Sequence, residues 1–171
     1  QSLEGYHLVP IRHGLTIGEY ALMVNEMGWL KDLARADLTI IPLSNWERTM
    51  WLDDTGLPVP SMLPDVQDVE SLLAYMGMYL FKGTNLNIGH GTDQPFFRIG
   101  APWISGRILW KKVQDLDLPG VRFHQIRYKP QAIHDAERGP YYAGQMCSGL
   151  LMEVTNRNDF DPLATSTALM M

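Results

Sequence analysis

Apolar residues recur at helical spacing in the segment that follows Gly14. Thr16 and Glu19 match the Ser/Thr-x-x-Glu capping box, in which each side chain accepts a hydrogen bond from the backbone N–H of the other residue. The apolar positions that follow lie three or four residues apart, and they are Ile17, Tyr20, Ala21, Val24 and Met27. We therefore predict a helix over residues 17–27 that stops near Gly28.

The rest of the chain alternates between helical and strand patterns. The further predicted helices cover residues 68–75, 104–116 and 161–171. Short apolar runs and alternating segments predict strands over residues 38–43, 78–81, 121–128 and 150–155. The segment 89–100 is rich in glycine and polar residues, and we expect it to be a functional loop. This order predicts an α/β or α+β fold, with a mixed sheet and flanking helices.

Composition narrows the class of protein. Of the 171 residues, 46% are hydrophobic and 19% are charged, so we treat residues 1–171 as a single globular domain. The net charge of -5 argues against binding to a nucleic-acid phosphate backbone, which needs a basic stripe, so we expect no nucleic-acid partner. One cysteine, Cys147, and histidines outside metal-ligand spacings lead us to expect no metal and no cofactor. We also expect no membrane span, and the first residues lack the pattern of a signal peptide.

Three groups of short motifs follow one another along the chain. The first is residues 10–19 (PIRHGLTIGE). The second is residues 46–48 (WER) with Trp51 and residues 55–58 (TGLP). The third is residues 83–85 (GTN), 89–92 (GHGT), 95–96 (PF) and 100–103 (GAPW). Together, over about residues 6–162, they resemble the bacterial exo-β-N-acetylmuramidase (NamZ) family, formerly classed as a domain of unknown function.

The resemblance implies a two-domain, cell-wall-processing glycoside hydrolase of which this chain is the C-terminal domain. A Rossmann-like domain would precede the segment 13–16 in such a protein and is missing here, and the active site would lie between the domains. The implied activity is exo-release of N-acetylmuramic acid, so the implied ligand is a muropeptide or an amino sugar. The implied location is the periplasm or the exterior of the cell, and we expect the isolated chain to be inactive.

This sequence also departs from the family pattern at three places. Lys82 stands where the family has Glu, and His90 stands where it has Arg. The segment 60–64 is shorter than its family counterpart. These departures favour the alternative interpretation, a non-catalytic module that binds carbohydrate or cell wall.

Candidate chemistry is concentrated ahead of the first helix. Glycoside cleavage commonly uses two carboxylates, and the lactyl carboxylate of muramic acid would need cationic or N–H donors. Arg12 and His13 precede the positive end of a helix dipole at Thr16. We predict that Arg12 binds substrate and that His13 and Glu19 are catalytic. The alternative for Glu19 is a capping residue, and for Arg12 and His13 it is exposed loop residues.

Other predicted substrate-binding residues lie in loops or at the ends of elements, where scaffolds place function: Trp46, Arg48, Asn85, His90 and Thr92. Trp46 follows the predicted strand 38–43, where α/β folds place ligand sites. For Trp103 we expect a packing role. We expect six of the predicted site residues to converge on one face of the protein: Arg12, His13, Trp46, Arg48, Asn85 and His90.

Overall fold

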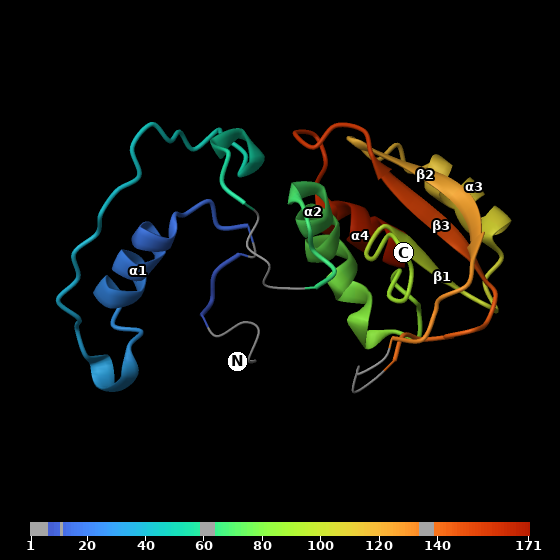
Figure 1. Ribbon diagram of the computed structural model, residues 1–171, viewed down its shortest axis with the longest axis horizontal. Helices are drawn as coiled ribbons and strands as arrows, with labels where there is room; N and C mark the ends of the chain where they lie inside the picture. Colours follow the sequence, from blue (N-terminus) through green and yellow to red (C-terminus); the bar gives the residue numbers. More distant parts are fainter. Residues whose placement is uncertain (1–6, 11, 59–63, 134–138) are drawn as a thin grey trace. The chain divides into compact units, whose positions relative to one another are not determined.

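The computed structural model describes residues 7–10, 12–58, 64–133 and 139–171 (Figure 1). The chain forms two compact units, Gln1–Thr55 (unit 1) and Gly56–Met171 (unit 2), where the sequence analysis treats it as one domain. Residues 60–63 of the shortened segment lie outside the described residues.

Unit 1 is built around helix α1 (Ile17–Glu26). Both hydrogen bonds of the predicted capping box are present: Thr16 N donates to Glu19 Oε2 at 2.8 Å, and Glu19 N donates to Thr16 Oγ1 at 3.2 Å. The single-turn helices η1 (Lys31–Leu33) and η2 (Asp53–Thr55) complete its regular structure in the described residues. The prediction of a helix over residues 17–27 is therefore confirmed.

Unit 1 has almost no hydrophobic core. Val24 is the buried hydrophobic residue among its described residues. Its neighbour Asn25 is also buried, and its amide group bonds both the N–H and the carbonyl of Ala36, at 2.8 and 3.0 Å. The predicted buried strand over residues 38–43 is wrong, because Ile41 is 91% exposed and no described strand of this unit offers a ladder partner.

Unit 2 combines helices with an antiparallel sheet (Figure 1). Its elements are α2 (Val69–Met78), η3 (Tyr79–Gly83), β1 (Arg98–Ala101), α3 (Gly106–Gln114), β2 (Val121–Tyr128), β3 (Cys147–Val154) and α4 (Pro162–Met170). The strand order is β1-β3-β2, and both pairings are antiparallel. The α/β or α+β class is confirmed, in its α+β form. The sheet of the described residues is antiparallel where a mixed one was expected.

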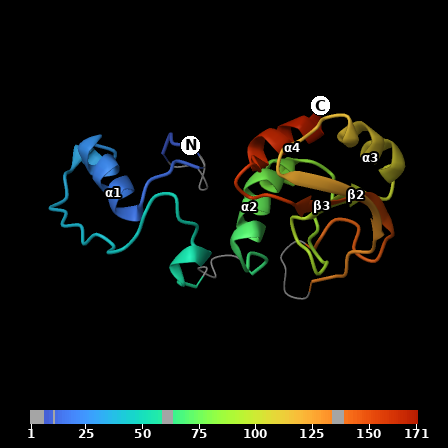
Figure 2. The same cartoon turned by 90° about the horizontal axis from the view of Figure 1, so that it is seen from above.

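The core of unit 2 lies between the sheet and its helices. Helix α3 packs on β2 and β3, and α2 packs against α4 (Figure 2). The buried side chains come from every one of these layers, among them Leu73, Met78, Val113, Phe123, Leu150, Met152 and Phe160. The strand predicted for residues 121–128 is β2. Its alternation is partial: exposed Arg122 and His124 flank buried Phe123, but Gln125 is also exposed, and the next buried residue, Tyr128, is five positions after Phe123.

Two segments of unit 2 differ from the sequence predictions. Residues 78–81 were predicted as a strand, but they end α2 and begin η3, because a four-residue apolar run fits either period. The expected loop 89–100 ends in strand β1, which pairs with β3 through Gly100 and Gly149. Glycine in this strand lets the two backbones lie in close contact, since a Cβ on Gly149 would meet the Ile99 carbonyl oxygen at 2.0 Å.

Gly77 sets the distance between helices α2 and α4. A Cβ at this position would lie 2.4 Å from the carbonyl oxygen of Pro162, a backbone atom that cannot rotate away. We predict that Gly77→Ala destabilises the chain by about 1–3 kcal/mol, because α4 must shift to accept the methyl group. Gly83→Ala is the matched control, since nothing lies within 4 Å of its added Cβ. Urea denaturation measures both, and equal stability of the two variants would contradict this packing.

Candidate functional site

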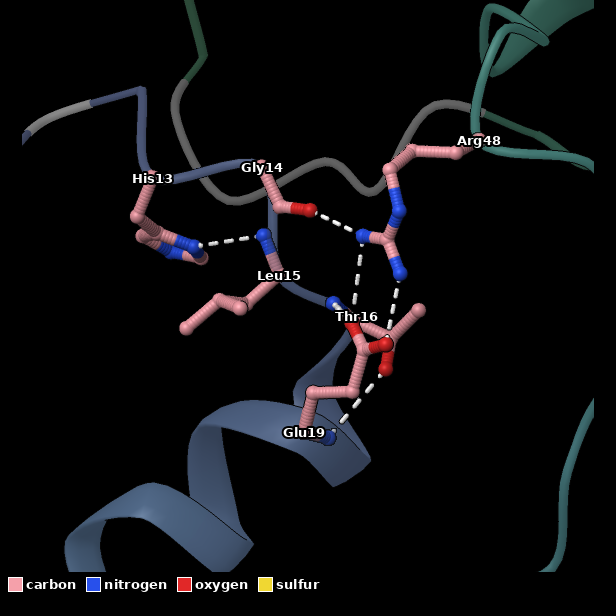
Figure 3. A network of polar contacts seen from close by, with 6 residues as sticks. All are labelled: His13, Gly14, Leu15, Thr16, Glu19 and Arg48. Carbon is pink, nitrogen blue, oxygen red and sulfur yellow. Dashed lines mark hydrogen bonds and ion pairs between the residues drawn. The ribbon is translucent and has the colours of Figure 1, made fainter.

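Arg48 joins the loop before α1 to the first turn of that helix (Figure 3). Its Nη2 lies 2.6 Å from Glu19 Oε1, and its Nη1 donates to Glu19 Oε2 at 3.2 Å. The same Nη1 also donates to the carbonyl oxygen of Gly14. The guanidinium thus binds a carboxylate in a bidentate manner and a backbone acceptor at once, an arrangement that lysine cannot reproduce.

These contacts fix the charge of Glu19. The hydrogen bond from Arg48 is the main cause that lowers the pKa of Glu19 from 4.5 to about 2, and the N–H of Thr16 adds to it. Glu19 in turn raises the pKa of Arg48. At neutral pH the pair is therefore an ion pair at the positive end of the α1 dipole.

His13 is held by its own loop and by α1. Its Nδ1 accepts a hydrogen bond of 3.0 Å from the N–H of Leu15, so in the neutral ring the proton is on Nε2. The ring stacks on Tyr20 with centroids 5.5 Å apart. The side chain is otherwise exposed, and its Nε2–H is the edge suited to donate to a ligand oxygen.

The two tryptophans of the second motif lie beside arginines. The guanidinium carbon of Arg12 is 5.3 Å from the centre of the Trp51 ring, and that of Arg48 is 5.5 Å from the Trp46 ring. Cation–π contacts of this kind hold a charged group in place while it stays in solvent. Trp46 therefore lies next to Arg48 as expected, although the strand expected to position it is absent from the described residues.

The predicted residues of unit 2 have separate partners. His90 Nδ1 lies 2.9 Å from Asp65 Oδ2, and the His90 and Phe96 rings lie edge to face with their centroids 5.1 Å apart. The carbonyl oxygen of Asn85 accepts a hydrogen bond of 2.8 Å from the Tyr142 hydroxyl. The Thr92 hydroxyl donates to the carbonyl oxygen of Gly89 at 2.7 Å, which closes the glycine-rich turn.

Asn87 holds this turn in place, although no sequence motif marked the residue. The residue is 1% exposed. Its Nδ2 donates to the carbonyl oxygens of His90 and Tyr141, at 3.1 and 3.0 Å. Its Oδ1 accepts from the N–H of Gly89 at 2.9 Å and from the Tyr128 hydroxyl at 3.1 Å. All four hydrogen-bonding positions of the amide are used, as a buried amide requires.

Two of the predicted substrate-binding residues, Thr92 and His90, line two different hollows of unit 2. A larger one of about 590 Å³ includes Thr92 in its lining, together with Asp93, His124 and Glu153. Two of its charged groups have charged partners: Asp93 lies 2.8 Å from Arg98, and His124 lies 2.6 Å from Glu153 and lowers the pKa of Glu153. A smaller hollow of about 80 Å³ is lined by His90 and by six other residues, which are Phe81, Lys82, Leu86, Asn87, Ile88 and Tyr141. Thr92 and His90 therefore face different spaces.

The residues expected to share one face belong to two different units. Arg12, His13, Glu19, Trp46 and Arg48 gather in unit 1, while Asn85, His90 and Thr92 lie in unit 2. Convergence of the two groups stays a prediction. The expected packing role of Trp103 is wrong, because this side chain is 61% exposed. Across residues 7–10, 12–58, 64–133 and 139–171, no group of three His, Cys, Asp or Glu side chains is arranged to hold a metal ion.

Comparison with known proteins gives consistent matches. Residues 1–70 match the family model for the N-terminal part of the exo-beta-N-acetylmuramidase NamZ, and residues 73–171 match the model for its C-terminal part. The chain is 34% identical, over 98% of its length, to the peptidoglycan beta-N-acetylmuramidase NamZ of Bacillus subtilis (strain 168) and covers 38% of that protein.

Two solved structures of DUF1343 family proteins from Bacteroides fragilis NCTC 9343 share the fold. One is 24% identical with a TM-score of 0.84 and covers 95% of this chain and 40% of its own. The other is 28% identical with a TM-score of 0.68 and covers 88% of this chain and 36% of its own. The chain thus spans about two fifths of the length of these relatives. The two family models together cover nearly all of its sequence, so the chain belongs to the exo-β-N-acetylmuramidase NamZ family.

Proposed function

We propose that this chain is part of a glycoside hydrolase that releases N-acetylmuramic acid from the ends of peptidoglycan fragments. The observation that carries the proposal is the cationic loop at the start of α1, in a chain 34% identical to a peptidoglycan β-N-acetylmuramidase. Muramic acid differs from other amino sugars by a lactyl carboxylate. A helix N-terminus flanked by arginines suits such an anion.

Arg12 is the proposed partner of the lactyl carboxylate. The side chain is exposed, and its contact with Trp51 orients the guanidinium without neutralising it. Trp46 offers a flat apolar ring next to Arg48 on which a sugar face can stack. In unit 2, Asn85, His90 and Thr92 remain the proposed substrate-binding residues.

His13 and Glu19 take different parts in the proposed chemistry. The Nε2–H of His13 can donate a hydrogen bond to the glycosidic oxygen. Transfer of that proton requires the imidazolium form, in which Nδ1 is also protonated and no longer accepts from the Leu15 N–H. Glu19 has a pKa of about 2 and both carboxylate oxygens engaged, so it holds no proton to give at neutral pH. We therefore propose His13 as the catalytic donor and Glu19 as the positioning residue that fixes Arg48 and the Gly14 loop.

A non-catalytic carbohydrate-binding module is the second candidate. The ionised state of Glu19 favours it, because a two-carboxylate mechanism needs one carboxylic acid that keeps its proton. In the first proposal that acid lies on the Rossmann-like domain of the longer protein, which also closes the site. Lys82 and His90, which replace residues typical of the family, also favour the binding module.

The proposed ligand is a muropeptide or a related amino sugar, and the proposed location is outside the cytoplasm. Both proposals rest on the similarity to the peptidoglycan-acting relative. Within the described residues, no helix combines the length and the apolar character needed to cross a bilayer.

A segment exchange separates the two candidate functions. This chain replaces the matching 168-residue segment of the Bacillus relative, and the chimera is assayed on a chromogenic N-acetylmuramic acid glycoside beside the 171-residue chain alone. We expect hydrolysis by the chimera and none by the chain alone, because a single side of the site lacks the second carboxylate. Saccharide binding without hydrolysis by the chimera would instead support the binding module.

Substitutions in the active chimera test the two residue roles. His13→Gln should lower kcat roughly 100-fold, because it removes a proton donor. Arg12→Ala should raise KM roughly tenfold, which corresponds to one lost charge-assisted hydrogen bond. Lys31→Ala, at an exposed cation of the same unit, is the control and should change neither constant. An unchanged kcat for His13→Gln would remove His13 from the mechanism.

The positioning role of Glu19 predicts a specific acid dependence. Because its folded-state pKa of about 2 is below its ordinary value of 4.5, the stabilising pair is complete above pH 4.5 and is lost as the pH falls through about 2. Carboxyl NMR titration should give this low midpoint, and Arg48→Ala should move it up towards 4.5. Arg35→Ala, which breaks the Arg35–Glu26 pair at the other end of α1, should leave it unchanged. A midpoint near 4.5 in the unsubstituted chain would contradict the pairing.

A further inference from the structure

Unit 2 exposes three neighbouring aromatic side chains that the proposed catalytic residues do not explain. Trp103 is 61% exposed and Tyr141 is 55% exposed, and Tyr142 between them is half-buried. Large aromatic side chains usually bury most of their surface, so an exposed group of them marks an interaction site.

A chain of hydrogen bonds holds these rings in fixed orientations. The Trp103 indole Nε1 donates to the Tyr142 hydroxyl at 3.0 Å, and that hydroxyl donates to the carbonyl oxygen of Asn85 at 2.8 Å. The carbonyl oxygen of Tyr141 accepts from the buried amide of Asn87, and the two tyrosine rings lie 6.1 Å apart. The Trp103 indole and the Tyr142 hydroxyl therefore use their polar atoms internally, while the side chains of Trp103 and Tyr141 stay largely exposed.

The backbone at this place is strained. Tyr142 has a φ of +61°, a conformation that costs a non-glycine residue free energy and is concentrated at functional sites. The side chain at this position supplies both hydrogen bonds of the relay, which gives a reason for a tyrosine where glycine would be relaxed. The strained backbone at Tyr142 thus places its ring beside both Tyr141 and Trp103.

A small hollow adjoins the aromatic group. Tyr141, Lys82 and His90 contribute to its lining, and its volume is about 80 Å³. Since a water molecule takes up about 30 Å³ in the liquid, this space fits one small substituent and not a whole sugar ring. Lys82 brings a cation to it, held 2.6 Å from the Tyr79 hydroxyl, and His90 brings a ring oriented by Asp65.

We propose that Trp103, Tyr141 and Tyr142 form a saccharide-binding platform, on which an N-acetylated amino-sugar residue of a glycan chain stacks while one of its substituents enters the hollow. The apolar C–H face of a pyranose matches a flat aromatic surface, and its hydroxyl and acetamido groups stay at the wet edges. The net charge of -5 repels the phosphate backbone of nucleic acids, whose bases are the other ligands that stack on such platforms. The identity of the saccharide rests on the proposed function, whereas the stacking surface does not.

Binding to peptide-free peptidoglycan glycan strands tests the platform. With the 171-residue chain, calorimetric titration should show Trp103→Ala binding roughly fivefold more weakly, the loss expected for one aromatic stacking partner. Tyr142→Phe keeps the ring but removes the relay and should bind roughly twofold more weakly. Ile108→Ala on α3 is the matched control, because it removes another side chain that is 60% exposed, and its affinity should equal that of the unsubstituted chain.

The outcomes separate the platform from the proposed function. Unchanged affinity in both Trp103→Ala and Tyr142→Phe overturns the platform, and so does an equal loss in Ile108→Ala. If Trp103→Ala fails to fold by circular dichroism, Tyr142→Phe decides alone. Single-stranded DNA that competes with the glycan for Trp103 would overturn the saccharide assignment. Trp103-dependent glycan binding in a chimera that hydrolyses nothing would refute the hydrolase and uphold the platform.

Discussion

The buried amide of Asn87 is the constraint on which the candidate surface of unit 2 depends. Four hydrogen bonds from this one side chain connect the turn at Gly89 and His90 with Tyr128 of β2 and with the backbone of Tyr141. Its own backbone is paired with Gly100, at 2.9 and 3.0 Å, so the hub is also anchored to β1. Loss of the amide would leave several buried groups without partners, which costs more than any single hydrogen bond contributes. The positions of His90 and of the aromatic platform thus follow from one core residue.

Unit 1 has very little hydrophobic core, and charged groups hold the start of its helix in place instead. With Val24 as its buried hydrophobic residue in the described part of the unit, α1 cannot be held by packing alone. The capping box and the Arg48–Glu19 pair instead attach the Gly14 loop to the start of the helix. Ion pairs in solvent are individually weak, so such a loop can respond to a bound anion. Unit 1 thus holds the start of its helix by a capping box and an ion pair, whereas unit 2 holds its candidate surface through a buried amide.

Features that depend on neighbouring residues were predicted correctly from the sequence, whereas features that depend on distant residues were not. The capping box of α1 and the extent of strand β2 depend on neighbours within a few residues, and both were predicted. The segment 38–43 has strand composition, but a strand also needs a partner, and composition does not supply one. Asn87 has no pattern around it, and its contact with Tyr141 spans 54 positions of the chain. The packing role expected of Trp103 was wrong for the same reason, since the partner of its indole N–H, Tyr142, is 39 positions away along the chain.

The central claim is that this chain binds an amino sugar through the surface that Asn87 organises. The most direct measurement is a ¹⁵N–¹H NMR titration with the N-acetylmuramic acid–N-acetylglucosamine disaccharide. The Trp103 indole Nε1–H and the Asn87 side-chain amide report on the platform and on its anchor, and we expect both signals to shift with one common Kd. Shifts confined to residues around His124 and Glu153 in the larger hollow, with Trp103 and Asn87 unmoved, would contradict the account.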